Sequence, residues 1–125
     1  MGFSEGPSIS SDGLYLAFQS NADINGINNG GNTEIYLFDV IGEIFIQITD
    51  TSNGDSRSPS TNANGERIAF SSNANINNGN PDGSNEIYLA NTTNGVITQI
   101  TNTAGGTVSL SPSINADGTR IAFES

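Results

Sequence analysis

Hydrophobic and polar residues alternate in short runs along the chain, and a turn-forming dipeptide closes most runs. In the run from Leu14 to Gln19, the side chains of Leu14, Leu16 and Phe18 share one face of a predicted strand. Asn-Gly and Asp-Gly pairs, which favour the positive φ values of tight hairpin turns, separate the runs. No stretch of useful length has hydrophobic residues spaced as on one face of a helix. The pattern predicts an all-β protein of short strands and turns.

The chain is built from an internal repeat. Its copies begin at Pro7, Pro59 and Pro112 with the sequences PSISSDGLYLAFQS, PSTNANGERIAFSS and PSINADGTRIAFES. Further along, the segment 34–37 (EIYL) recurs at 86–89, in the same phase of the repeat. Agreement at so many positions indicates a repeat architecture, in which each copy buries its apolar face against the next copy.

Each full repeat is predicted to contain four strands. In the first repeat these strands lie around 8–10, at 14–19, at 34–40 and at 44–49. The third strand is apolar on both faces, with Ile35 and Leu37 on one and Tyr36 and Phe38 on the other. A strand that is apolar on both faces is packed between two layers. Four antiparallel strands in each of several stacked repeats form the blades of a β-propeller.

We therefore predict an all-β fold of β-propeller blades within a single repeat domain, 1–125. The predicted units are one four-stranded antiparallel blade at about 7–58, a second at about 59–111, and a C-terminal half-blade at 112–125. Phe18, Phe70 and Phe123 hold the same repeat position, and we expect them to be buried in equivalent places.

The repeat also carries a family resemblance. The succession Pro-Ser-x-x-x-Asp-Gly-x-x-Ile-Ala-Phe-x-Ser, Glu-Ile-Tyr-Leu and Thr-Gln-Ile-Thr resembles the PD40 repeat, a WD40-like unit of TolB-type bacterial propellers. The resemblance covers residues 7–125. The sequence differs from the family at the turn between the first and second strands. There the usual Ser-Pro-Asp-Gly is replaced by Ser-Ser-Asp-Gly, Ala-Asn-Gly or Ala-Asp-Gly.

The connection between the second and third strands is also longer than in the TolB type, and in this it resembles PD40 repeats of exported bacterial and cyanobacterial proteins. The resemblance thus implies a periplasmic or extracellular protein, although the first five residues lack the basic and apolar regions of a signal peptide. The role of TolB in envelope complexes is not carried over to this chain.

Composition excludes several kinds of chemistry. The 125 residues include no Cys, His, Lys or Trp, and three Arg oppose thirteen Asp and Glu for a net charge of −10. Disulfides, His/Cys zinc sites and Ser-His or Cys-His nucleophile pairs are therefore excluded. The chain lacks the basic patch that binds nucleic acid, and it has no apolar run approaching the ~20 residues of a membrane span. We expect a protein that is not an enzyme.

The connections between the second and third strands carry the candidate ligands. Oxygen-bearing side chains at alternate positions before a glycine are how a loop wraps Ca²⁺. The candidate Ca²⁺ ligands are Asn21, Asp23, Asn25, Asn80, Asp82 and Glu86. The alternative is a structural loop, in which the Asn side chains form hydrogen bonds with their own backbone.

Other repeated positions favour structural roles. Glu34 and Glu86 share one repeat position, so we interpret them as part of the fold rather than as a catalytic pair of carboxylates. Tyr36 and Tyr88 are expected to pack between blades. Tyr15, Arg67 and Arg120 share a position whose side-chain stems are expected to be packed, with the Arg head groups exposed.

These observations favour a non-catalytic β-propeller scaffold, acting as a protein-interaction or self-assembly module. The alternative is a Ca²⁺- or ligand-binding module that uses the Asn/Gly-rich connections. Propellers close with about four to eight blades. A chain with two and a half blades therefore requires further blades, or self-association, to form a closed ring. Two geometries are expected for self-association: edge-to-edge pairing of two half-blades, or head-to-tail stacking of chains.

Overall fold

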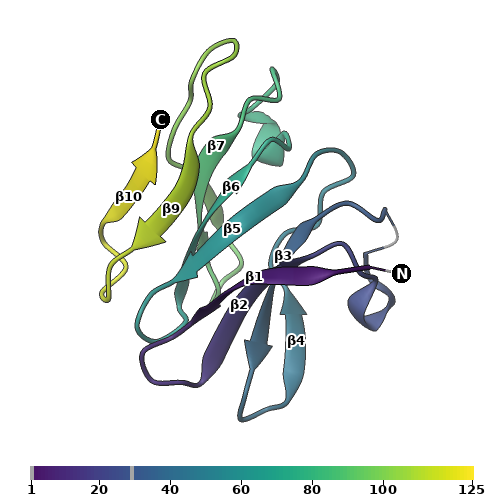
Figure 1. The fold of residues 1–125 in the computed structure, drawn as a ribbon, viewed down its shortest axis with the longest axis vertical. Coiled ribbons are helices and arrows are strands. Elements are labelled where there is room, and N and C mark those ends of the chain that lie inside the picture. The colour runs from purple at the N-terminus through teal and green to yellow at the C-terminus, as the bar shows by residue number, and fades with distance from the viewer. Residues whose placement is uncertain (1, 29) are drawn as a thin grey trace.

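The computed structural model describes residues 2–28 and 30–125, and the side chain of Asn25 lies outside this description. Ten strands and two 3-10 turns form within the described residues, which confirms the all-β prediction (Figure 1). The strands are β1 (Ser4–Ile9), β2 (Tyr15–Ser20), β3 (Glu34–Asp39), β4 (Ile44–Gln47), β5 (Ser56–Thr61), β6 (Arg67–Ser72), β7 (Glu86–Asn91), β8 (Ile97–Gln99), β9 (Leu110–Ile114) and β10 (Ile121–Glu124). The turns are η1 (Ile24–Gly26) and η2 (Ile76–Asn78).

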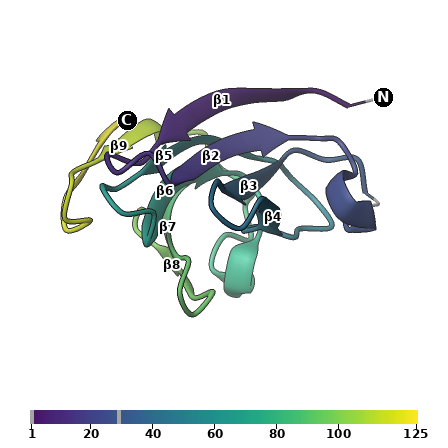
Figure 2. The same cartoon turned by 90° about the horizontal axis from the view of Figure 1, so that it is seen from below.

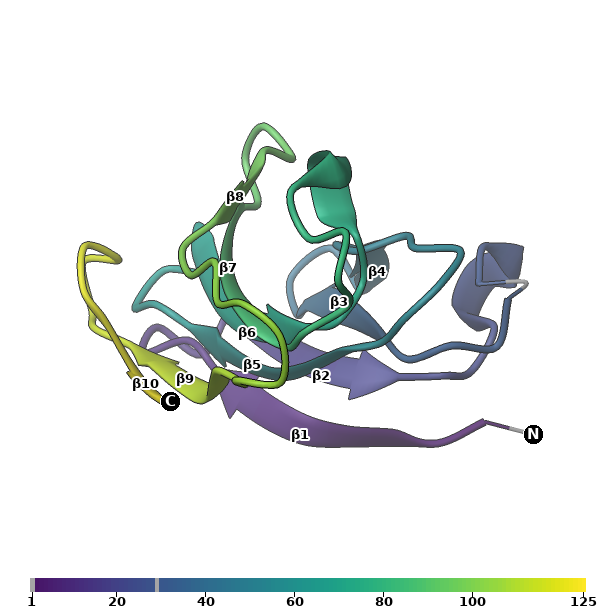
Figure 3. The ribbon, with the colours of Figure 1, turned by 90° about the horizontal axis from the view of Figure 1, so that it is seen from above.

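The strands form three antiparallel sheets in sequential order. The first sheet is β1-β2-β3-β4, the second is β5-β6-β7-β8, and the third is the pair β9-β10. The prediction of two four-stranded blades and a half-blade is confirmed. The first strands β1, β5 and β9 lie next to one another, whereas the last strands β4 and β8 lie on the opposite side of the molecule (Figures 2 and 3).

The core lies between the two full blades. Its buried members are Ala17, Ile35 and Leu37 of the first blade and Ile68, Phe70, Tyr88 and Ala90 of the second. The third strands β3 and β7 are buried on both faces, as their sequence predicts. Burial of both faces follows from their position inside a sheet that is itself covered by a neighbouring sheet.

Each first strand begins before the proline that opens the repeat, earlier than predicted. The residue before that proline has a positive φ in all three copies: 63° at Gly6, 56° at Ser58 and 52° at Ser111. The pairing register of β1, β5 and β9 shifts at this point. A bulge here suits proline, which has no N–H group to donate to the neighbouring strand.

Two repeated contacts join successive blades. The Thr61 amide donates to Ser8 Oγ at 3.1 Å, and one blade further the Ile114 amide donates to Ser60 Oγ at 3.1 Å. The turn glycine of each following blade also faces a side chain of the preceding blade. A Cβ on Gly65 would lie 2.6 Å from the ring of Tyr15.

The same contact recurs one blade further, where a Cβ on Gly118 would lie 2.8 Å from Cγ of Arg67. These contacts confirm packed stems for Tyr15 and Arg67. Arg120, the third member of this repeat position, is exposed.

The prediction of equivalent burial is wrong for one of the three phenylalanines. Phe18 and Phe70 are 8% and 0% exposed, whereas Phe123 is 41% exposed. Phe18 and Phe70 each stack on a tyrosine from the neighbouring third strand, at 5.6 Å between ring centroids. Within the described residues β10 has no such neighbour, so the ring of Phe123 stays partly open to solvent.

Candidate functional site

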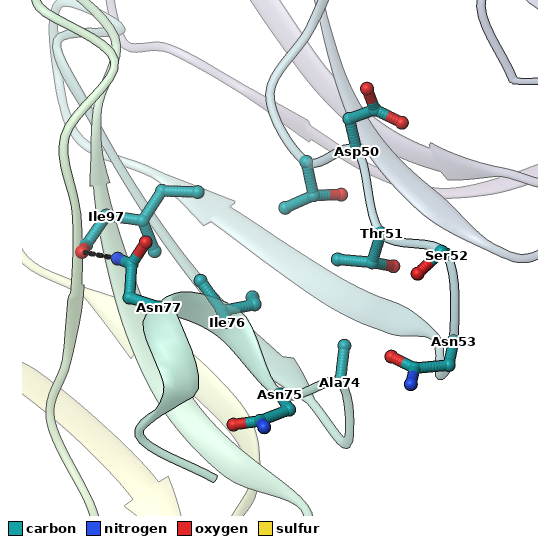
Figure 4. A pocket seen from close by; sticks show the side chains of 10 residues that line it. Asp50, Thr51, Ser52, Asn53, Ala74, Asn75, Ile76, Asn77 and Ile97 are labelled. Atoms are coloured by element: carbon teal, nitrogen blue, oxygen red, sulfur yellow. Dashed lines mark hydrogen bonds between the residues drawn. The ribbon is translucent and has the colours of Figure 1, made fainter.

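A cleft between the two full blades is the first candidate site. Its volume is about 320 Å³. One wall is the segment 49–53, which follows β4, and the other consists of 74–77 and Ile97. Figure 4 shows Asp50, Thr51, Ser52 and Asn53 on the first wall and Asn75, Ile76 and Asn77 on the second. There the side-chain Nδ2 of Asn77 donates to the Ile97 carbonyl at 3.2 Å. The cleft is thus bordered by amide, hydroxyl and carboxylate groups.

Beside this cleft, the carboxylate of Glu34 is fully buried and surrounded by donors. Its Oε1 accepts hydrogen bonds from the Thr51 amide and hydroxyl, both at 2.7 Å, and from Asn32 Nδ2 at 2.6 Å. Its Oε2 accepts a hydrogen bond from the Thr49 hydroxyl. The carboxylate therefore joins the start of β3 to the segment after β4.

Glu86 repeats this arrangement in the second blade. Its Oε1 accepts from the Thr103 amide at 2.7 Å, from the Thr103 hydroxyl at 2.6 Å and from Ser84 Oγ at 2.9 Å. Thr101 donates to its Oε2. Burial alone would raise the pKa of Glu86, but these hydrogen bonds stabilise the charged form and lower the pKa below its ordinary value.

The repetition identifies Glu34 and Glu86 as one structural feature present in each full blade. Sequence reasoning recognised their shared position but missed the threonines that bind them. A signal was present, because Thr49-Asp50-Thr51 recurs as Thr101-Asn102-Thr103 in the same phase of the repeat.

Among the candidate Ca²⁺ ligands, Asn80, Asp82 and Glu86 lie close together around Ser84. The Ser84 hydroxyl is 2.8 Å from Asp82 Oδ1, 2.9 Å from Glu86 Oε1 and 3.3 Å from Asn80 Oδ1. Asp82 Oδ2 also accepts a bond from the Gly105 amide at 3.3 Å. The oxygen atoms of this group therefore accept hydrogen bonds from their own loop and from the segment after β8.

Asn80 has a further role as a brace inside its loop. Its Nδ2 donates to the Ser84 carbonyl at 2.8 Å and to the Ala74 carbonyl at 3.3 Å. In the first blade Asn28, which holds the equivalent position, donates to the Asn32 carbonyl at 2.9 Å. Both side chains are buried. These contacts are those expected of a structural loop.

Among the described side chains of the first loop, the candidates Asn21 and Asp23 do not form a comparable group. Asn21 Oδ1 accepts a bond from the Phe3 amide at 2.8 Å. Asp23 is exposed and precedes η1 without a side-chain capping bond. The side chain of Asn25 lies outside the described residues. The described part of the chain has no group of three or more Asp and Glu side chains suited to holding a metal ion. Ca²⁺ binding stays a prediction.

The two repeated tyrosines are buried, and Tyr88 packs in the core between the two full blades. The hydroxyl of Tyr88 is 3.4 Å from the Ala74 carbonyl, and its ring stacks on Phe70. Burial, together with the nearby charge of Glu86, raises the pKa of Tyr88 to about 12. Tyr36 stacks on Phe18 in the same way. Both tyrosines therefore act as packing groups.

An apolar hollow of about 370 Å³ lies on the outward face of the first blade. Leu16, Phe18, Ile24 and Phe45 contribute its apolar lining. Phe45 contacts both Phe18 and Phe38, with ring centroids 6.1 and 4.8 Å apart. We call the cluster formed by Phe18, Tyr36, Phe38 and Phe45 the outward aromatic face. Phe45 remains 43% exposed.

No helix in the described part of the chain is long and apolar enough to cross a membrane. No protein-family model and no curated protein sequence matches the chain. Its structure is similar to that of the protein described as TolB from Agrobacterium tumefaciens, with a TM-score of 0.68 and 17% identity, over 98% of this chain and 38% of that one.

The structure is also similar to the β-propeller domain of the Trilobed protease from Pyrococcus furiosus, whose topology is described as an open velcro. The TM-score is 0.65 at 15% identity, over 98% of this chain and 34% of that one. For the tricorn protease the TM-score is 0.57 at 24% identity, over 92% of this chain and 10% of that one.

The chain therefore spans less than two fifths of the length of each of these structures. At these identities the likeness establishes the fold alone. Together with the sheet order, it shows that this chain is a segment of β-propeller architecture, related in fold to TolB-type and protease propeller domains.

Proposed function

We propose that the chain is a non-catalytic propeller scaffold that associates with further blades, including those of a second copy, through the outward aromatic face. The supporting observation is a repeat equivalence. Phe18 and Tyr36 hold the positions of Phe70 and Tyr88, which pack the second blade onto the first. The same side of the first blade has no sheet against it within the described residues.

The size of the exposed groups supports this role. In the second blade the positions beside the Phe-Tyr stack are held by Ala90, which is buried, and by Ile97, which is partly buried. In the first blade they are held by Phe38 and Phe45, so more apolar surface faces solvent. Exposed apolar patches of this kind are typical of protein–protein contact sites.

Light scattering of the purified chain tests the proposal. We expect the wild type to exceed the 13.0 kDa of one chain at high concentration. Phe45→Lys places a charge on the outward aromatic face and is expected to return the mass to one chain. Ile41→Lys is the matched control, because Ile41 is 75% exposed and lies in the turn after β3. Equal association of the Phe45→Lys and Ile41→Lys variants would refute the proposal.

A second candidate function is the binding of Ca²⁺ or a polar ligand at the cleft between the blades. The observation in its favour is the set of polar side chains on both walls, among them Asp50, Asn53 and Asn75. Calorimetric titration with Ca²⁺ separates this function from the first. Saturable heat that Asp50→Ala removes would support a site in the cleft, and an absence of saturable heat would eliminate Ca²⁺ as its ligand.

A further inference from the structure

Asn-Gly pairs form turns, and they are also chemically reactive. The backbone nitrogen that follows an asparagine can attack Cγ of the asparagine side chain, and a following glycine has no Cβ to obstruct the approach. A hydrogen bond that holds this nitrogen or the side-chain amide opposes the attack. Of the six Asn-Gly pairs in the sequence, the structure describes four together with their side chains, at Asn53, Asn64, Asn78 and Asn94.

Hydrogen bonds restrain three of these four pairs. The amides of Gly65, Gly79 and Gly95 donate to backbone carbonyls at 3.5, 3.2 and 2.8 Å. The side-chain oxygens of Asn64 and Asn94 also accept hydrogen bonds from backbone amides, at 3.2 and 3.0 Å. These bonds must break before the nitrogen can reach Cγ, so the folded structure slows the reaction at all three sites.

The pair Asn53-Gly54 lacks both restraints. Within the described residues, neither the side chain of Asn53 nor the amide of Gly54 takes part in a hydrogen bond. The pair nevertheless has a defined place, because the Gly54 carbonyl accepts a hydrogen bond from Asn32 Nδ2 at 3.0 Å. The next amide, that of Asp55, donates to Asn73 Oδ1 at 2.7 Å. Asn53 is exposed to solvent, so its side chain is open to water and free to react.

We propose that Asn53 is a site of spontaneous deamidation. The Gly54 nitrogen attacks Cγ of Asn53 and loses its proton, and the side-chain nitrogen leaves as ammonia, which closes a cyclic imide. Water then adds to one of the two imide carbonyls and breaks the bond from that carbonyl to the Gly54 nitrogen. One opening yields aspartate, and the other yields isoaspartate, whose main chain runs through the former side chain. Water is the only other reactant, and the reaction is independent of the proposed scaffold role.

The product changes the charge of the cleft between the two full blades. Asn53 lies on the same wall of the cleft as Asp50, and the other wall carries Asn75 (Figure 4). Asp50 is the one acidic residue among those that line the cleft. Deamidation adds a second carboxylate to its wall, and a cleft lined by charges of one sign attracts ions of the opposite sign. The reaction thus converts a polar cleft into an acidic one that attracts cations.

The isoaspartate product also affects the contact between blades. A Cβ on Gly54 would lie 2.7 Å from Cα of Ala74, which belongs to the second blade. Isoaspartate inserts an additional carbon into the main chain directly before this close approach, whereas aspartate leaves the main chain unchanged. We therefore expect the accumulation of isoaspartate at position 53 to lower the melting temperature of the chain.

Peptide mapping by mass spectrometry tests the inference. The folded wild type is incubated in mildly alkaline buffer, and the deamidated fraction at each of the four pairs is followed over time. Asn53 is expected to react about tenfold faster than Asn94, since the hydrogen bonds that must break at Asn94 raise the barrier. In urea concentrated enough to unfold the chain, the four rates are expected to converge. The unfolded chain thus separates the effect of the fold from that of the local sequence.

Two variants assign the reaction and its cause. Asn53→Gln is expected to abolish the modification at this position, because the longer glutamine side chain would have to close a larger ring. Asn91→Ala removes the side-chain oxygen that accepts hydrogen bonds from the amides of Thr93 and Asn94, at 2.9 and 3.4 Å. This variant is expected to speed deamidation at Asn94 and to leave the rate at Asn53 unchanged.

The effect on the contact between blades is measured by incubating the wild type and Asn53→Gln together. Their melting temperatures are expected to be alike before incubation, and the wild type is expected to melt lower afterwards. The variant is the matched control, because it shares every other site at which the chain ages. Equal losses in melting temperature would contradict an effect of isoaspartate on this contact.

The inference is wrong if Asn53 reacts no faster than Asn94 in the folded chain, or if the same order of rates persists in urea. The first result would show that the unpaired Gly54 amide gives no advantage, and the second that the local sequence rather than the fold sets the order.

Discussion

The Thr103 hydroxyl donates a hydrogen bond of 2.6 Å to Oε1 of Glu86, and this contact connects the start of β7 with the segment after β8. The Thr51 hydroxyl makes the same bond to Glu34 at 2.7 Å. Each full blade is therefore closed at one end by a buried carboxylate that is held by threonines. Charged acceptors of this kind contribute more to stability than neutral ones.

Glu86→Gln is expected to lower the free energy of unfolding by about 1.5–3 kcal/mol, because a charged acceptor of several hydrogen bonds is lost. The pKa of Glu86 is lowered in the folded state, so protonation favours unfolding. Its contribution to stability is therefore present above the ordinary value of 4.5 and is lost as the pH falls through the folded-state pKa. Urea unfolding at several pH values measures both effects.

The matched control for this carboxylate is Glu66→Gln, which changes an exposed carboxylate beside β6. It is expected to leave the free energy of unfolding nearly unchanged. If both variants lose the same stability, the threonine contacts of Glu86 do not stabilise the blade.

Alanine substitutions at two equivalent glycines separate the contribution of the contact between blades from the cost to the backbone. Gly13 and Gly65 occupy the same repeat position with φ values of 72° and 76°. A Cβ on Gly13 meets nothing within 4 Å, whereas one on Gly65 would lie 2.6 Å from the ring of Tyr15. Both alanine variants share a backbone cost of about 1–2 kcal/mol. Gly65→Ala is expected to lower the free energy of unfolding by about a further 1–3 kcal/mol, because its methyl group would overpack against Tyr15.

Thermal unfolding of the two alanine variants measures the difference. Equal destabilisation would mean that the Tyr15 ring moves away without cost, and that the packing of this turn contributes little to the contact between blades.

The repeated phenylalanines are expected to differ in their contribution to stability. Phe70 is fully buried in the core between the blades, so Phe70→Ala is expected to cost roughly 3–5 kcal/mol. Phe123→Ala removes a ring that is 41% exposed and is expected to cost much less. Chemical unfolding curves for the two variants test this order, and a reversed order would be inconsistent with the burial of Phe70.

Much of the fold could be predicted because the repeat carries its own internal evidence. The positions of Pro7, Pro59 and Pro112 fixed the phase, and the segments that begin at Glu34 and Glu86 have one pairing pattern. The bulge before each proline was missed, because serine at positions 58 and 111 is not a residue that signals positive φ.

The candidate site was less predictable than the strands. Alternating oxygen side chains predicted metal ligands, but the same side chains satisfy backbone groups, as Asn21 Oδ1 does for the Phe3 amide. Sequence alone does not separate these roles, since an Asn side chain that accepts from a backbone amide and one that binds a cation use the same oxygen atom. Equivalent burial of Phe123 was expected from the repeat position alone, and it is wrong because, within the described residues, β10 has no neighbouring strand that carries the repeated tyrosine.

Asp82 offers a test of the two interpretations of the second loop. Its carboxylate accepts hydrogen bonds from the backbone amides of Ser84 and Gly105. We expect Asp82→Ala to lower the melting temperature equally in calcium and in chelator, because these internal bonds are lost in both. A stabilisation of the wild type by calcium that disappears in Asp82→Ala would instead show that this loop binds Ca²⁺.

The proposed function requires the outward aromatic face to associate with further blades, including those of a second copy. Sedimentation velocity over a wide range of protein concentration tests this association. We expect the average mass to rise with concentration above the 13.0 kDa of one chain. A single folded species of 13.0 kDa at every concentration would contradict self-association through the outward aromatic face.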